Sequence, residues 1–286
     1  MAEARPEDIR NAETDDEYWK QFENKWTSLL TYRYLGRTHP VLDEGASKQS
    51  MPLRHDMRNA VGGIMAAPLV ISCPEGGGMA DDFYVPNPVI QSMMILDDAK
   101  GVRQVDGIQE TIRMGRTMGF SRSRIVDADN PDRLIAISEG MCVSIGDTPP
   151  GFEPVDNPMI EIVDSPDLPP LHHVFGARKR EDGHWILPEL TGEMASPDAA
   201  LHLGPIVIVL ETAANDIAFA EAGTDALQIE SWHVQYVARG KIGPFRASGE
   251  ATTSKDGKIG VRVMLHDEGN DDRPVTSAQA TYRRAD

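Results

Sequence analysis

Two polar side chains interrupt apolar stretches of this sequence and are candidates for chemistry. Asn59 precedes two glycines and a run of small apolar residues in the segment MRNAVGGIMAA, residues 57–67. Glu211 lies inside the apolar segment PIVIVLETAANDIAF, residues 205–219. A carboxylate is costly to bury without a partner, so Glu211 either reaches solvent or a cleft, or it has a function. A carboxylate so placed can act as a general base on water or as a nucleophile.

The simpler interpretations of these polar residues remain open. An Asn before two glycines is typical of a turn or a helix N-cap. His202 fits a helix-start residue whose ring bonds nearby backbone, and Asn215, one turn after Glu211, shares its helical face. His172 and His173 follow two prolines and have no further ligand at a metal spacing, so we expect a loop and no metal there.

Composition restricts the classes of function. With 286 residues, 40% of them hydrophobic, the chain fits one large domain or two domains of about 100–150 residues. A net charge of -17 repels polyanions, so we expect no nucleic-acid partner.

The sequence also bears on location. No run approaches the roughly 18 apolar residues of a membrane span, and the acidic N-terminus lacks the basic region of a secretory signal. We therefore expect a cytoplasmic protein without a membrane partner. Cys73 and Cys142 are the only thiols, and they are interpreted as small buried hydrophobes in a reducing compartment. The sequence predicts neither a metal site nor a cofactor.

The elements that must position Asn59 and Glu211 follow the same order twice. An amphipathic helix is expected within residues 15–34, where Trp19, Phe22, Trp26, Leu29 and Leu30 share one stripe. Next come glycines leading into the apolar run 62–73, a strand at 88–96 and long strands over 107–145 broken at 127–133. The second series has a helix at 202–223, a strand at 226–238 and further strands over 244–283.

These two series predict an α+β fold of two related units. Each unit has one substantial helix followed by about four strands with short connections, which implies an antiparallel sheet wrapped on a helix. Placing the two sheets edge to edge would remove one exposed edge from each. We expect an N-terminal segment at 1–45, a first unit at 46–147, a Pro- and Asp-rich connector at 148–170 and a second unit at 171–286.

The segment MRNAVGGIMAA resembles the loop-to-helix signature of hotdog-fold acyl-CoA thioesterases of the phenylacetic-acid type. That signature has an Asn and a Gly before a His-Gly-Gly at the start of the central helix, and a carboxylate nine residues after the His. The segment 115–145 resembles the paired closing strands of the same family. The resemblance extends from about residue 46 to the end. It implies a double hotdog, in which the two sheets form one continuous sheet and each wraps on a central helix.

The two units keep different parts of the signature. In the first, Asn59 and Gly62 match the Asn and Gly, the His-Gly-Gly positions hold Met65, Ala66 and Ala67, and Pro74 stands at the carboxylate position. In the second, His202 matches the His, Leu203 and Gly204 follow it, Glu211 stands at the carboxylate position, and Ser196 replaces the Asn. The first unit therefore keeps the amide, and the second keeps the acid.

The resemblance implies sites shared between units, because in hotdog dimers one protomer supplies the Asn and the helix start, and the other supplies the carboxylate. Asn59 and the first helix start should then face Glu211. The backbone N–H groups of Met65, Ala66 and Ala67 are the candidate oxyanion donors. Gly62, Gly63, His202 and Asn215 complete the candidate substrate contacts. The opposite site would pair Ser196 with Pro74, and proline can neither activate water nor attack a carbonyl.

The implied substrate is an acyl-CoA, which needs cations for its phosphates. The first unit's strands carry alternating arginines, and alternation at even spacing places side chains on one face of a sheet. They are Arg113, Arg116, Arg122 and Arg124. Guanidinium groups suit phosphates, and Arg116 and Arg122 are the candidates for coenzyme A. Such a row also fits the solvated face of a sheet. The resemblance further implies a homodimer. Two rival functions remain open: non-catalytic binding of acyl thioesters or scaffolding, and hydration or dehydration of enoyl thioesters.

Overall fold

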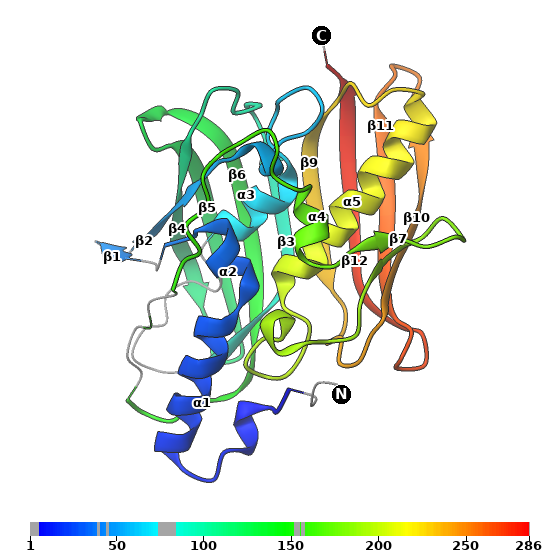
Figure 1. The fold of residues 1–286 in the computed structure, drawn as a ribbon. Coiled ribbons are helices and arrows are strands. Elements are labelled where there is room, and N and C mark those ends of the chain that lie inside the picture. The colour runs from blue at the N-terminus through cyan, green and yellow to red at the C-terminus, as the bar shows by residue number, and fades with distance from the viewer. Residues whose placement is uncertain are drawn as a thin grey trace.

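One antiparallel sheet runs through both units of the protein and carries two central helices on one face (Figure 1). The computed structural model describes residues 6–38, 41–43, 46–73, 84–151, 155 and 158–285. The sheet has 12 strands in the order β1-β2-β4-β5-β6-β3-β9-β12-β11-β10-β8-β7. The predicted α+β class and the continuous sheet are therefore confirmed.

The first unit contributes six strands and the short central helix α3. Their bounds are β1 Val41–Asp43, β2 Ala46–Pro52, α3 Ala66–Ser72, β3 Tyr84–Ile95, β4 Gln104–Met114, β5 Met118–Asp127 and β6 Asn130–Asp147. The expected break before the closing strand lies between β5 and β6. Because β1 pairs with β2, the sheet begins within the segment that the sequence assigned to the N-terminal helix.

The second unit contributes the other six strands and the long central helix α5. Their bounds are α4 Leu171–Val174, β7 Arg178–Lys179, β8 Trp185–Leu187, α5 Leu203–Ala222, β9 Leu227–Tyr236, β10 Phe245–Thr253, β11 Ile259–Asp267 and β12 Arg273–Arg284. Strand β3 pairs antiparallel with β9, with Met93 opposite Trp232, and this pairing joins the two half-sheets. His172 and His173 lie in α4, a single helical turn, rather than in the expected loop.

The internal repeat is visible in the loops that precede the two central helices. The N–H of Met65 donates to the carbonyl of Met57, and the N–H of His202 donates to the carbonyl of Met194. Isolated bridges also join Arg58 to Ile64 and Ala195 to Leu201. All of these positions differ by 137 residues, from 202 − 65 or 194 − 57. The repeat of the sequence is therefore a repeat of structure.

The N-terminal segment forms two helices where the sequence pattern predicted one. Helix α1 spans Asp15–Ser28 and α2 spans Leu30–Leu35, and Leu29 between them has an extended ψ of 110°. The aromatic rings of α1 contact one another, with centroids 5.6 Å apart for Trp19 and Phe22 and 5.5 Å apart for Phe22 and Trp26, and Trp26 extends the row to Tyr32 of α2 at 5.1 Å. The break turns α2 toward the start of α5.

Helix α5 is apolar on nearly all sides because the sheet and its neighbours enclose it. Residues 203–214 are all buried. By length and composition alone α5 could cross a membrane, which corrects the expectation that no run approaches that length, but 72% of its most apolar window is buried inside the protein. The core helix of a soluble protein has the same property.

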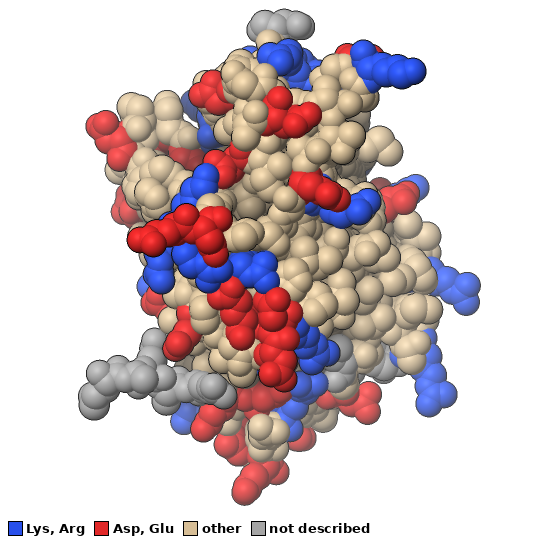
Figure 2. Space-filling model, turned by 90° about the vertical axis from the view of Figure 1, so that its right-hand side faces the viewer, with Lys and Arg blue, Asp and Glu red and all other residues tan. Residues whose placement is uncertain are grey.

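The Pro- and Asp-rich connector is irregular, as its composition predicts. The described part of residues 148–170 forms neither helix nor strand. The surface charges are distributed unevenly, because Figure 2 shows a wide area without charged side chains, bordered by clusters of acidic and basic residues.

Candidate functional site

Glu211 of the second unit lies against the first turn of the first unit's central helix. Its Oε1 accepts a hydrogen bond of 2.6 Å from the N–H of Ala66, and its Oε2 accepts one of 2.6 Å from the N–H of Ala67. The structure therefore brings Glu211 to two adjacent residues, Ala66 and Ala67, that precede it by 145 and 144 positions in the sequence.

The position of Glu211 follows from the incomplete capping of α3. A helix start leaves backbone N–H groups without intrahelical partners, and Met65 at the N-cap supplies no side-chain acceptor. The carboxylate fills this role, and its charge is favourable at a helix start. At the other end of α3, the carbonyl of Ile71 accepts a hydrogen bond from Arg37 and that of Ser72 accepts one from Gln49. Other segments thus supply both caps of α3.

The environment of Glu211 favours its neutral form. The residue is 1% exposed. Burial raises the pKa of the Glu211 carboxyl to about 7, although the hydrogen bonds from Ala67 and Ala66 lower it. No salt bridge to Glu211 exists within the described part of the chain. A carboxyl with this pKa can accept and return a proton near neutral pH, as a general base must.

Asn215 and Tyr282 lie beside Glu211. The hydroxyl of Tyr282 donates a hydrogen bond of 2.9 Å to Oδ1 of Asn215, which lies one turn after Glu211 on α5. Burial, followed by the charge of Glu211, raises the pKa of Tyr282 well above its usual value. Tyr282 was not found from the sequence, because it is one of several aromatic or apolar residues that alternate along an ordinary strand.

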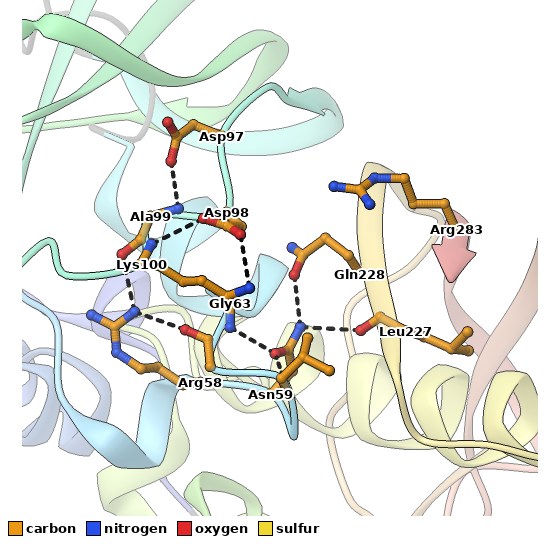
Figure 3. A network of polar contacts seen from close by, with 12 residues as sticks. Arg58, Asn59, Gly63, Asp97, Asp98, Ala99, Lys100, Leu227, Gln228 and Arg283 are labelled. Atoms are coloured by element: carbon orange, nitrogen blue, oxygen red, sulfur yellow. Dashed lines mark hydrogen bonds and ion pairs between the residues drawn. The ribbon is translucent and has the colours of Figure 1, made fainter. Parts of the chain in front are cut away.

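Asn59 is bonded within the junction of the two units rather than to Glu211 (Figure 3). Its Oδ1 accepts hydrogen bonds from the N–H groups of Val61 and Gly63, at 3.1 and 2.8 Å. Its Nδ2 donates to Oε1 of Gln228 at 3.0 Å and to the carbonyl of Leu227 at 3.3 Å. These four bonds agree with the turn interpretation, and they also fasten the loop before α3 to the start of β9.

The two glycines after Asn59 meet different requirements of this loop. Gly62 has a φ of 77°, in the left-handed region that glycine adopts without strain. A Cβ on Gly63 would lie 2.0 Å from Oε1 of Gln228, so a larger residue at this position would displace that amide from its hydrogen bond with Asn59. Gln228 is a second residue that sequence reasoning missed.

The equivalent region at the start of α5 is filled by protein side chains. His202 is the N-cap of α5, where its Nδ1 accepts a hydrogen bond from the N–H of Gly204, and its Nε2 lies 3.2 Å from the hydroxyl of Tyr32. Thr31 packs so closely that a Cβ on Gly204 would lie 2.3 Å from it. Helix α2 therefore covers the start of α5, and the structure does not bring His202 to Glu211.

The position equivalent to Asn59 belongs to a buried ion-pair network. Asp198 accepts hydrogen bonds from the hydroxyl of Ser196 and from the guanidinium of Arg239, which also donates to Asn87 on β3. The first unit's carboxylate position, Pro74, lies outside the described residues. In the described part of this opposite region, the polar side chains of Ser196, Asp198 and Arg239 bond to one another.

The two predicted coenzyme A arginines lie away from Glu211. Arg122 is exposed on the face of the sheet opposite the helices, and it pairs with Glu110 at 2.6 Å. Arg116 is exposed in the turn between β4 and β5. The structure does not bring either of them to the start of α3.

Solved structures similar to this one are known. The chain matches the tesB protein of Mycobacterium avium subsp. paratuberculosis with a TM-score of 0.57 and 10% identity, over 93% of this chain and 100% of that one. It matches the acyl-CoA thioesterase II TesB2 of Mycobacterium marinum with a TM-score of 0.56 and 12% identity, over 85% and 94% of the two chains. The chain has the double-hotdog fold.

A third match has the hot dog fold without a known function. A hot dog fold protein of unknown function from Alicyclobacillus acidocaldarius gives a TM-score of 0.52 and 9% identity, over 86% of this chain and 96% of that one. No protein-family model matches this chain, and no curated protein matches its sequence. The fold alone does not identify the function, which must be argued from the side chains of this protein.

Proposed function

We propose that this protein hydrolyses acyl-CoA thioesters at the contact between Glu211 and the first turn of α3. The observation that carries the proposal is the pair of short hydrogen bonds from the N–H groups of Ala66 and Ala67 to the Glu211 carboxylate. They place a buried base beside two backbone donors, which are the groups that hydrolysis of a thioester needs.

The proposed reaction uses the same two N–H groups twice. Glu211 takes a proton from a water whose oxygen attacks the thioester carbonyl carbon, so negative charge leaves the carboxylate as it develops on the carbonyl oxygen. The N–H groups of Ala66 and Ala67 are then held less strongly by the neutral carboxyl and can donate to the oxyanion. The carbon–sulfur bond breaks, the carboxyl of Glu211 protonates the leaving thiolate, and the free acid and thiol are released.

Asn59 has a positioning role in this proposal. Its amide holds the loop before α3 against β9, and this contact fixes where the N–H groups of Ala66 and Ala67 point. Hydrogen bonds used within the loop are not available to a substrate, so we assign the oxyanion to the helix start and not to Asn59.

A thiol-release assay tests the proposal. With a panel of acyl-CoA esters, we expect Glu211→Gln to lower the rate of thiol release by about 10²-fold or more, the usual contribution of a positioned base. Glu221→Gln is the matched control, because it removes the same charge from the exposed end of the same helix, where Glu221 contacts Thr253. We expect it to keep the native rate.

The same assay decides between hydrolysis and the non-catalytic alternative. That alternative is favoured by one observation: the N–H groups of Met65, Ala66 and Ala67 all have acceptors within the protein. Glu211 would then be only a clamp between α3 and α5. Equal rates for the native protein and Glu211→Gln, or no thiol release with any ester of the panel, would contradict hydrolysis and leave the clamp.

A further inference from the structure

A groove crosses the outer face of the sheet, on the side opposite α3 and α5. Its volume is about 580 Å³, and it extends from β4 across β5, β6 and β3 to β9. Met94 in this groove is 59% exposed, whereas Met93 and Ile95, its neighbours in the chain, are buried in the core. An apolar groove of this size is typical of a site for a small ligand.

One row of side chains across the groove combines a cation with apolar residues. The strand register places Arg124 on β5 between Ile108 on β4 and Ile137 on β6. The row continues through Met94 on β3 to Ser231 on β9. Arg124 is exposed, and within the described part of the chain no carboxylate pairs with it. Because a guanidinium group matches the geometry of a carboxylate, this row suits an anionic head followed by an apolar tail.

The neighbouring row in the groove carries the carboxylates. There the register places Arg122 between Glu110 and Glu139, and Arg122 bonds Glu110 at 2.6 Å. On β3 and β9 the same row ends in Ser92 and His233, whose Oγ and Nδ1 atoms are 2.6 Å apart. One arginine between two carboxylates leaves this row with a negative charge. The row therefore repels an anionic head and directs it to Arg124.

The remaining cations of this face are paired or lie outside the groove. Lys48 extends the row of Arg124 onto β2, but its Nζ pairs with Asp106 at 2.7 Å. Arg113 is exposed and in register with Phe120, beyond the row of carboxylates and outside the groove lining. Arg124 is therefore the cation that an anion in the groove meets first.

We infer that this groove binds a single-chain carboxylate of about ten carbon atoms, with its head on Arg124 and its tail across the apolar side chains of the same row. From Arg124 to Ser231 the row crosses three strand spacings, about 14 Å in all, which is the length of a chain of about ten carbons. Past Ser231 the row continues with Thr281 and Gly260, which offer no large apolar side chain. A longer tail therefore gains little further burial.

Isothermal titration calorimetry with octanoate, decanoate and tetradecanoate tests the inference. We expect decanoate to bind about fourfold or more tightly than octanoate, because two more methylene groups are buried, and tetradecanoate to gain less than twofold over decanoate. Arg124→Gln should weaken decanoate binding by about tenfold or more, because it removes a charge-assisted contact. Met94→Gln should weaken it by about threefold or more, because it places an amide beside the tail.

Matched controls make the test specific. Arg262→Gln removes an exposed arginine from the second unit's sheet, and Met159→Gln replaces an exposed methionine of the connector. Both should bind decanoate like the native protein. Glu211→Gln should do the same, because Glu211 lies on the helix side of the sheet, and this separates the groove from the proposed hydrolytic site. Unchanged circular dichroism and melting temperature would show that the variants are folded.

A cationic amphiphile with the same tail tests the role of charge. Decyltrimethylammonium should bind at least about tenfold more weakly than decanoate, because Arg124 repels its head. Equal affinities for the two amphiphiles, equal decanoate binding by the native protein and Arg124→Gln, or loss of binding in Glu211→Gln would overturn the inference. No decanoate binding up to about 1 mM would also overturn it. If the native protein then sediments as a dimer, a second copy covers this face instead.

Discussion

At the scale of the residue, Glu211 links folding to protonation. Its carboxyl has a pKa near 7 in the folded protein and an ordinary value of 4.5, so the folded state binds the proton more tightly than the unfolded chain does. The stabilisation from this protonation is fully present below about pH 4.5 and is lost as the pH rises through 7. The shift corresponds to a free energy on the order of 3 kcal/mol.

Chemical denaturation at several pH values measures this linkage. As the pH rises from 5 to 8, we expect the free energy of unfolding to fall by about 3 kcal/mol because of Glu211. Glu211→Gln removes the titrating group and should remove this component of the slope, whereas Glu221→Gln should keep it. If the free energy of unfolding depends on pH equally in the native protein and in Glu211→Gln, the Glu211 carboxyl has the same pKa in the folded and unfolded states, which contradicts the prediction.

Sequence reasoning found the residues whose type conflicts with their surroundings. A carboxylate inside an apolar helix is unusual, and this conflict identified Glu211 before its partners were known. Gln228 and Tyr282 present no such conflict, because polar and aromatic residues are common on strands that are solvated on one side. Their contacts with Asn59 and Asn215 join distant positions, at separations of 169 and 67 residues. Only the assembled fold shows them.

At the scale of the element, α3 depends on the rest of the protein because it has only seven residues. Helices of this length are marginal in isolation. Glu211 caps its first turn, and Arg37 and Gln49 cap its last turn. Asn59 holds the loop before it through a hydrogen bond from the N–H of Gly63. The position of the Ala66 and Ala67 N–H groups is therefore set by side chains from several segments.

The close packing of Gly63 in the loop before α3 predicts a loss of stability when a methyl group is added there. Gly63→Ala should lower the free energy of unfolding by about 1–3 kcal/mol, because the added methyl would force the buried Gln228 amide away from its hydrogen bond with Asn59. Gly192→Ala is the control, since a Cβ there meets nothing within 4 Å. The melting temperatures of these variants check the prediction.

A second substitution identifies the cause of the loss. In a background of Gln228→Ala, the added methyl at Gly63 meets only Nδ2 of Asn59, at 3.2 Å, so we expect the further loss caused by Gly63→Ala to become smaller. A loss of the same size in both backgrounds would assign the effect to the backbone of the loop and not to Gln228.

Element boundaries were predictable where a local signal marks them. The segment DADNPDR predicted the break between β5 and β6, which the structure places after Asp127. The apolar stripe of the N-terminal helix continues past Leu29, so its spacing carried no sign that the helix breaks there. The cause is tertiary, because Leu29 is fully buried and α2 packs against the start of α5.

At the scale of the whole molecule, the two units share a fold and differ in what fills the junction between them. At one end, a carboxylate meets the start of α3. At the other, Tyr32 bonds His202, and Arg239 pairs with Asp198. The family resemblance implied that Glu211 would meet the start of α3. It did not indicate that Asn59 bonds Gln228 instead of facing Glu211, or that α2 covers the start of α5.

The pKa of Glu211 is a property of the assembled molecule, because both units bury the carboxyl. The central claim is that this carboxyl is the base that activates water. The most direct test is the pH dependence of kcat/KM for thiol release from an acyl-CoA ester. We predict that kcat/KM falls about tenfold per pH unit below an apparent pKa of about 7, the value for Glu211, and levels off above it. A native profile that stays flat from pH 5.5 to 8.5 would contradict the claim.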